Sequence, residues 1–250
     1  MVSSGLKKHG IDTEITHSKT RMTDIAVIMG PNLWKGIESD GGEYIILNRK
    51  FLGFGERDVH ENCSISWNGF NGMGIFCVDE NSMSERRLEK YIKTEEIDDW
   101  DLGYDKYLLC EQSDVGRSKK YTNINEYYQE IRRKIPSHLL KTRKKNTLEK
   151  MGQVEFIRAL RNDLSDVRSI FSLNSTVSVE SIILGKGVIT EDVTNPCYGV
   201  CRDGVKPFDR TRFLTYLAHC QWHVEEIMAG EFFKNMTSGA KGPRLHEITK

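Results

Sequence analysis

Two cysteines and two histidines near the C-terminus have the residue types and the spacing of a zinc site. Cys197 and Cys201 form a C-x3-C pair in a predicted loop. His219 and His223 follow, four residues apart, in a helix predicted over 209–228. Residues at this spacing project from the same face of a helix. Zinc takes cysteine and histidine ligands in a tetrahedron, and a structural site fills all four positions, so we expect a structural zinc cofactor here.

The ligand assignment leaves three alternatives open. Cys220 lies next to His219 and could replace it as a ligand. Without a metal, the two histidines would be solvated and the two loop cysteines free. In the third alternative, Cys197 and Cys201 form a disulfide. The spacing does not favour the small DNA-binding finger, because seventeen residues separate the cysteine pair from the histidine pair, against about twelve in that finger.

The same predicted helix carries a weaker candidate for catalysis. Glu226 lies within one turn of His223, so it could orient the imidazole or act as a general base. With zinc or this pair doing the chemistry, the chain would be a hydrolase or transferase. Its pocket would lie between the glycine-rich β region and the C-terminal helix. Solvated helix surface is the simpler interpretation of both side chains, so the catalytic residues stay unassigned.

Charged residues are distributed unevenly, although 36 Lys+Arg balance 36 Asp+Glu. Residues 79–114 contain twelve acidic and five basic side chains, whereas residues 115–161 contain thirteen basic and four acidic ones. Tyr121, Tyr127 and Tyr128 lie among the basic residues, and this combination suits phosphate backbones and unstacked bases. The predicted basic face comprises Arg132, Arg133, Lys134, Lys141, Arg143, Lys144 and Lys145.

This basic face would bind nucleic acid or an acidic protein partner. In the alternative, the acidic and basic segments face each other within the fold or across a dimer. Both alternatives are compatible with a net charge of zero.

An apolar stripe predicts the longest helix, over 147–171. Its members recur at steps of three and four residues, which places them along one face. We expect this face to pack on the chain's own sheet, and a homodimer seam is the alternative. The stripe consists of Ile157, Leu160, Leu164, Val167 and Phe171.

Short strands are predicted where β-rich runs alternate with glycine pairs and turns. Asn68-Gly69 predicts a hairpin that joins residues 64–67 to 70–78. Gly185-Lys186-Gly187 predicts a second hairpin between 178–184 and 188–193. The remaining predicted strands are 25–29, 43–48 and 107–110.

Capping residues predict two further helices. Ser82 or Ser84 would begin a helix over 85–97. Asn123 or Asn125 would begin a helix that ends at Lys134, before Pro136. The fold class is therefore α+β. It combines a β-rich N-terminal half containing hairpins with a C-terminal half of a long amphipathic helix, a β-hairpin and a final helix.

The domain organisation is expected to be simple. Residues 21–236 form one α+β domain with a sub-boundary near 115–146, and residues 1–20 and 237–250 are polar, flexible tails. No apolar run approaches the roughly 18 residues of a membrane span, and the N-terminus lacks the pattern of a signal peptide. We therefore expect an intracellular, cytoplasmic location without membrane contact.

These features favour a non-enzymatic regulatory or interaction protein. A structural zinc site would hold its C-terminal part together, and the basic face would bind nucleic acid or an acidic protein. The alternative function is the zinc-dependent or His/Glu-dependent hydrolase or transferase.

Overall fold

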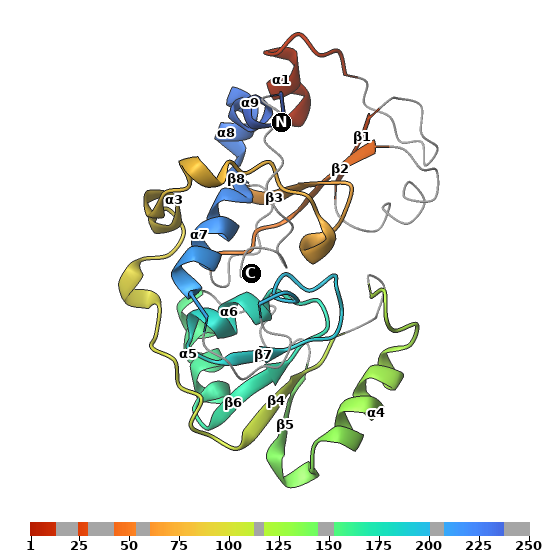
Figure 1. The fold of residues 1–250 in the computed structure, drawn as a ribbon, viewed down its shortest axis with the longest axis vertical. Helices are drawn as coiled ribbons and strands as arrows, with labels where there is room; N and C mark the ends of the chain where they lie inside the picture. The colour runs from red at the N-terminus through yellow and green to blue at the C-terminus, as the bar shows by residue number, and fades with distance from the viewer. Residues whose placement is uncertain are drawn as a thin grey trace.

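The structure is a computed structural model that describes residues 1–13, 25–29, 43–53, 61–112, 118–144, 153–200 and 208–237. In this part of the chain, helices and strands are mixed and the strands form two four-stranded sheets, so the predicted α+β class is confirmed. Figure 1 shows the two sheets in different halves of the molecule. No helix within the described ranges has both the length and the apolar character needed to cross a membrane.

The first sheet contains β1 (Ile25–Met29), β2 (Glu43–Arg49), β3 (Asn62–Trp67) and β8 (Gln221–His223). Its strand order is β1-β2-β3-β8. β1 is parallel to β2, whereas the other two pairs are antiparallel. The strands predicted at 25–29, 43–48 and 64–67 are therefore confirmed, and a strand from the far C-terminal part completes the sheet.

Three short helices pack beside the first sheet. They are α1 (Val2–Lys7), α8 (Val224–Ala229) and α9 (Glu231–Thr237). Leu6 of α1 is buried in one apolar cluster with Ile227 and Phe233. Residues 2–7, which the sequence analysis places in a flexible tail, thus form a helix with a buried contact, and residues 238–250 lie outside the described part of the chain.

The second sheet contains β4 (Lys106–Cys110), β5 (Leu140–Arg143), β6 (Val167–Phe171) and β7 (Gly187–Ile189). All four strands are parallel, in the order β5-β4-β6-β7. From β4 the chain moves to its neighbour β5 and then crosses back to β6 on the opposite side of β4. The strand order therefore reverses between β4 and β6.

Helices cover both faces of this parallel sheet, as Figure 1 shows. Tyr127 packs against Phe171 on one face, and Leu160 and Ile182 pack against Ile170 on the other. Burial on both faces explains why the consecutive residues Leu108, Leu109 and Cys110 of β4 are all buried. The covering helices are α4 (Ile124–Lys134) on the first face and α5 (Gln153–Leu164) and α6 (Val177–Ile183) on the second.

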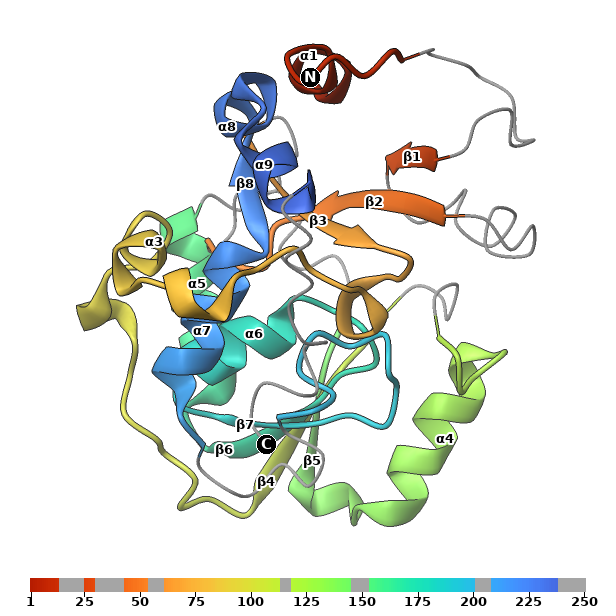
Figure 2. The ribbon, with the colours of Figure 1, turned by 45° about the horizontal axis from the view of Figure 1, so that its top comes forward.

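A shared core joins the two halves. Phe51 and Phe76 from the first half lie in one buried cluster with Leu214 of α7 (Arg210–His219) and Val179 of α6. In Figure 2, α6 and α7 lie between the two sheets. The remaining short elements are η1 (Asn71–Met73), η2 (Glu80–Ser82), α3 (Glu85–Glu89), η3 (Thr94–Glu96) and η4 (Ser137–Leu139).

The predicted helix over 147–171 is too long. α5 ends at Leu164, and the last residues of the stripe belong to strand β6. Val167 and Phe171 are buried in β6, which lies between β4 and β7, and Leu160 and Leu164 are buried on the face of α5 that packs against the core. Four of the five stripe residues are therefore buried within the chain's own fold and Ile157 is partly buried, so the homodimer seam stays a prediction.

The predicted hairpin over 178–193 is wrong. Residues 177–183 form helix α6, and β7 pairs in parallel with β6 instead of folding back on residues 178–184. Gly185 has a φ of 72°, but it ends a helix and does not turn a hairpin. The hairpin predicted at Asn68-Gly69 forms a single antiparallel bridge, between Trp67 and Ile75. Part of the segment predicted as its second strand is instead the 3-10 helix η1.

The predicted capping residues are confirmed for two helices. Ser84 accepts a hydrogen bond from the backbone of Arg86 at the start of α3. Asn123 caps α4 in the same way, and α4 ends at Lys134 as predicted. The helix expected over 85–97 stops at Glu89, however, and only the single turn η3 follows.

Candidate functional site

The predicted zinc ligands lie on different elements. The helix predicted over 209–228 is interrupted: α7 ends at His219, β8 covers residues 221–223, and α8 begins at Val224. His219 and His223 therefore do not share one helix face, and the geometry assumed for the histidine pair is wrong. Cys197 is fully buried in the apolar core, and Cys201 lies outside the described residues.

Pairing with β3 explains the interruption. Trp222 pairs with Cys63 and His223 with Asn62 in the β3–β8 ladder. Beside them, the buried Gln221 Oε1 accepts hydrogen bonds from the backbone N–H groups of Phe51 and Leu52, both at 2.9 Å. A continuous helix would leave these backbone groups without a partner, and burying unpaired polar groups is costly.

In the described ranges, no three histidine, cysteine or acidic side chains lie close enough together to hold one metal ion. Because Cys201 is outside these ranges, the zinc site stays a prediction. Cys220, the alternate ligand, is a buried free thiol in the same apolar cluster as Cys197.

Three buried cysteines are poor nucleophiles. Burial raises the pKa of the Cys63 and Cys110 thiols to about 12. Burial also raises the pKa of Cys220 well above its ordinary value. Because the thiolate is the reactive form, none of these three side chains suits nucleophilic catalysis.

His219 is held as a neutral acceptor. Its Nε2 atom accepts a hydrogen bond from the backbone N–H of Ser84 at 3.1 Å. Burial and the nearby positive charge of Arg87 lower the pKa of His219, while the Glu226 carboxylate acts in the opposite direction.

His219 is therefore expected to make the protein less stable in mild acid. The unfolded chain binds a proton near pH 6.5, whereas the folded chain does so only at lower pH, so stability is lost as the pH falls below about 6.5. His219→Gln keeps an acceptor that does not titrate, and the fall in Tm between about pH 7 and pH 5 should become smaller. The exposed His138→Gln serves as the control. Identical Tm profiles for the two variants would contradict this prediction.

The candidate catalytic pair is not arranged as an acid and a base. His223 Nδ1 accepts the backbone N–H of Glu225 at 3.4 Å. Glu226 receives the backbone N–H of His223 at 2.9 Å and ion pairs from Arg87 and Lys90, both at 3.1 Å. Burial alone would raise the pKa of Glu226, but these donors lower it overall. A carboxylate held ionised by three donors is a structural anchor and a weak base.

The predicted basic face is divided by the fold. Lys134 pairs with Glu130 and Glu191 at 2.7 Å, and Lys141 pairs with Asp166 at 2.5 Å. Arg132 and Arg133 are exposed on α4, Arg143 is largely buried, Lys144 is exposed, and Lys145 lies outside the described residues. Within the described ranges, these basic side chains therefore do not form one uninterrupted surface, and partner binding stays a prediction.

The carboxyl end of the parallel sheet brings together polar groups that the sequence analysis missed. Gln112 follows β4 and reaches across to the segment after β6. Its Oε1 accepts the backbone N–H groups of Leu173 and Asn174 at 3.1 and 3.2 Å, and its Nε2 donates to the Asn174 Oδ1 at 2.5 Å. The side-chain amide of Gln112 thus spans the place where the strand order reverses.

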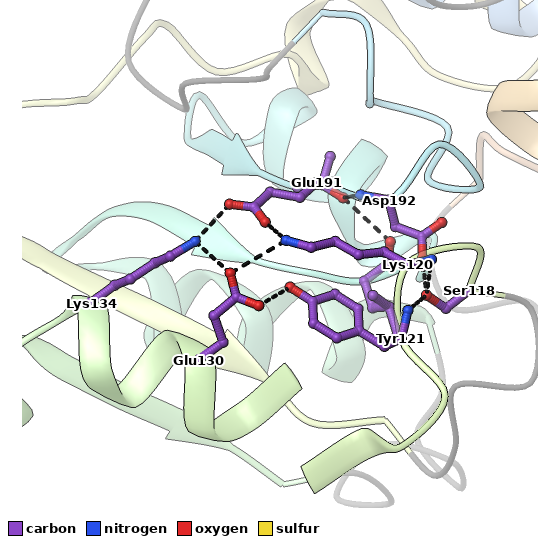
Figure 3. A network of polar contacts seen from close by, with 9 residues as sticks. Ser118, Lys120, Tyr121, Glu130, Lys134, Glu191 and Asp192 are labelled. Carbon is purple, nitrogen blue, oxygen red and sulfur yellow. Dashed lines mark hydrogen bonds and ion pairs between the residues drawn. The ribbon is translucent and has the colours of Figure 1, made fainter. Parts of the chain in front are cut away.

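A charged network lies beside this position (Figure 3). Lys120 and Lys134 each contact both Glu130 and Glu191. Hydrogen bonds from Lys134 and from the Tyr121 hydroxyl lower the pKa of Glu130 to about 2. Glu130 therefore remains ionised at neutral pH, and the network joins α4 to the segment that follows β7.

A buried carboxylate continues the network. Asp192 accepts hydrogen bonds from the hydroxyls of Ser118 and Thr194 and from the backbone N–H of Thr194. Asn195 donates through its side chain to the backbone oxygen of Ser172 and to the Ser178 hydroxyl. These contacts fix the segments after β4, β6 and β7 against one another.

The missed residues had one usable signal in the sequence. Residues 167–171 are a short β-rich run, Asn174, Ser175 and Thr176 are turn and cap residues, and Gly185 follows a helical stretch. This strand, cap, helix and glycine order is typical of a parallel β-α-β unit. The apolar stripe and the glycine pair favoured the two wrong predictions instead.

Comparisons with known proteins show only a distant structural similarity. No protein-family model matches the chain, and no curated protein matches its sequence. Among solved structures, Thermosulfurimonas dismutans KpsC, described as a beta Kdo 2,7 transferase, matches with a TM-score of 0.42 and 14% identity over 85% of each chain. Similarity at this level does not identify a function.

Proposed function

We propose that this chain binds a nucleotide-type small molecule at the carboxyl end of its parallel sheet, between β4 and β6. The observation that carries the proposal is the strand order β5-β4-β6-β7 with its reversal between the two central strands. In open parallel sheets, the connections on either side of such a reversal diverge to opposite faces and leave a crevice outside the strand ends. Ligands of α/β proteins bind in this crevice.

The side chains at this position support the proposal. Gln112 and Asn174 hold the two diverging segments in a defined geometry. Thr176 is the partly exposed N-cap residue of α6, and its side chain accepts no capping hydrogen bond. Hydroxyl and amide groups held on rigid segments are suited to hydrogen-bonding a polar ligand.

This proposal keeps the hydrolase or transferase alternative of the sequence analysis but moves its site. His223 and Glu226 are engaged in the capping of α8 and in the Arg87 ion pair. The segments after β4, β6 and β7, in contrast, end at one edge of a sheet and are mutually hydrogen-bonded. A hydrolase or transferase of nucleotide-linked compounds would use this edge for substrate binding.

The test is calorimetric titration with a panel of nucleoside monophosphates, nucleoside diphosphates and nucleotide sugars. We expect one class to bind with a Kd in the micromolar range and Thr176→Val to weaken that binding about tenfold without lowering the Tm. Thr122→Val, an exposed threonine beside α4, is the matched control and should bind like the unaltered protein. If no member of the panel binds, or if both variants bind equally, the proposed site is wrong.

A further inference from the structure

A row of side chains crosses the parallel sheet at its carboxyl end. Arg143 pairs with Cys110 in the β5–β4 register. Phe171 pairs with Leu109, so Ser172, the next residue, lies opposite Cys110. Registered residues of parallel strands project to the same face. Leu108 and Cys110 share the core cluster that contains α5 and α6, so this row lies on the face covered by those two helices.

Two members of this row carry buried polar atoms that lack hydrogen-bond partners in the described structure. The side chain of Arg143 is only 9% exposed, and its Nη1 and Nη2 atoms donate no hydrogen bond to any described residue. The hydroxyl of Ser172, a fully buried residue, likewise has none among the described residues. Buried donors of this kind are rare in folded proteins, and each requires an explanation.

Among the described residues, the guanidinium has one ion-pair partner, the carboxylate of Asp163. Its Nε atom lies 3.3 Å from Asp163 Oδ2, and its centre lies 5.7 Å from the ring centroid of Phe156. The carboxylate of Asp163 is itself 42% exposed, so water screens the attraction. The two Nη atoms thus form the paired donor edge with which arginine binds phosphate and carboxylate groups.

We propose that Arg143 and Ser172 hold a phosphate group of the ligand, with the Arg143 Nη edge and the Ser172 hydroxyl as donors. This proposal rests on the proposed function, because it assigns the anionic part of the same ligand. Cys110 lies between the two donors and keeps the surface between them neutral, since burial raises the pKa of its thiol to about 12. The sequence analysis placed Arg143 on a nucleic-acid face, whereas here its donors point into the covered side of a sheet.

The test uses inorganic phosphate and pyrophosphate, titrated by calorimetry and by thermal unfolding at constant ionic strength. The unaltered protein should show a Tm that rises with phosphate concentration. Arg143→Gln should weaken phosphate binding at least tenfold. Arg158→Gln removes the same group from an exposed position on α5 and should leave phosphate binding unchanged.

Ser172→Ala separates binding from folding. The hydroxyl has no described partner to lose, so this variant should unfold at the same or a higher Tm in phosphate-free buffer. It should nevertheless bind phosphate about fivefold more weakly. If Arg143→Gln does not fold, Ser172→Ala alone decides the result.

The inference is overturned if phosphate has no effect on the unaltered protein, or if Arg143→Gln and Ser172→Ala bind it as tightly as Arg158→Gln. The same measurements distinguish failure of the phosphate assignment from failure of the proposed function. Nucleotide binding that is insensitive to Arg143 and Ser172 would refute the phosphate assignment alone. Arg143-dependent phosphate binding without binding of any nucleotide would refute the proposed function alone.

Discussion

Gly185→Ala is expected to destabilise the protein by about 3 to 5 kcal/mol. Gly185 has a φ of 72°, in the left-handed region that disfavours residues with a Cβ atom. A Cβ atom added to this backbone would lie 1.9 Å from the carbonyl oxygen of Asp99. Since that oxygen belongs to a backbone segment and not to a flexible side chain, the chain itself would have to move.

The clash would break a specific contact between distant segments. The backbone N–H of Asp98 donates to the Ile183 oxygen, and that of Asp101 donates to the Gly185 oxygen, both at 2.9 Å. Lys186 adds an ion pair to Asp101 at 2.6 Å. These bonds hold the segment before β4 against the end of α6, so displacing Asp99 would weaken all of them together.

Urea unfolding followed by circular dichroism measures this effect. Gly103→Ala is the matched control, because a Cβ atom at Gly103 would meet nothing within 4 Å. We expect the control to unfold within about 0.5 kcal/mol of the unaltered protein. Equal unfolding midpoints for the two alanine variants would show that the predicted clash is absent.

Arg87→Met is expected to cost about 3 kcal/mol of unfolding free energy. The Arg87 side chain is 13% exposed and donates to the backbone oxygens of Ala218 and Gln221, at 2.9 and 2.7 Å. It also pairs with Glu226 through two nitrogens and lies 4.4 Å from the Trp222 ring centroid. Methionine preserves the apolar stem but removes every donor, so two carbonyl groups and a largely buried carboxylate lose a partner.

The exposed neighbour Arg86→Met provides the control and should change stability by less than about 0.5 kcal/mol. A double-mutant cycle with Glu226→Gln tests the cause. If the ion pair contributes, Arg87→Met should cost less in the Glu226→Gln background, because no carboxylate there loses its Arg87 partner. An effect of Arg87→Met no larger than that of Arg86→Met would contradict the anchoring role.

The successful sequence predictions depended on interactions between residues close in the chain. Asn123 caps α4, Ser84 caps α3, and the strands β1, β2 and β4 lie where β-rich runs predicted them. A capping hydrogen bond spans two or three residues, and its residue types are restricted, so it leaves a clear mark in the sequence.

The failures share one physical cause. The apolar residues within 167–171 and 221–223 continue a helical spacing, and residues 178–184 had the composition of a strand. Short apolar runs suit either conformation, and the partner decides between them. β6 is a strand because β4 and β7 pair with it, and β8 is a strand because β3 does.

The candidate site shows the same difference between what local sequence patterns predict and what tertiary contacts decide. Residue types and spacing were sufficient to recognise the mixed fold, the capped helices and the cysteine and histidine residues worth testing for zinc. The tertiary structure separated His219 from His223, and it placed Arg143, Ser172, Gln112 and Asn174 at one end of a parallel sheet. Strand pairing joins residues far apart in the chain, such as Asn62 and His223, and no local pattern encodes that choice of partner.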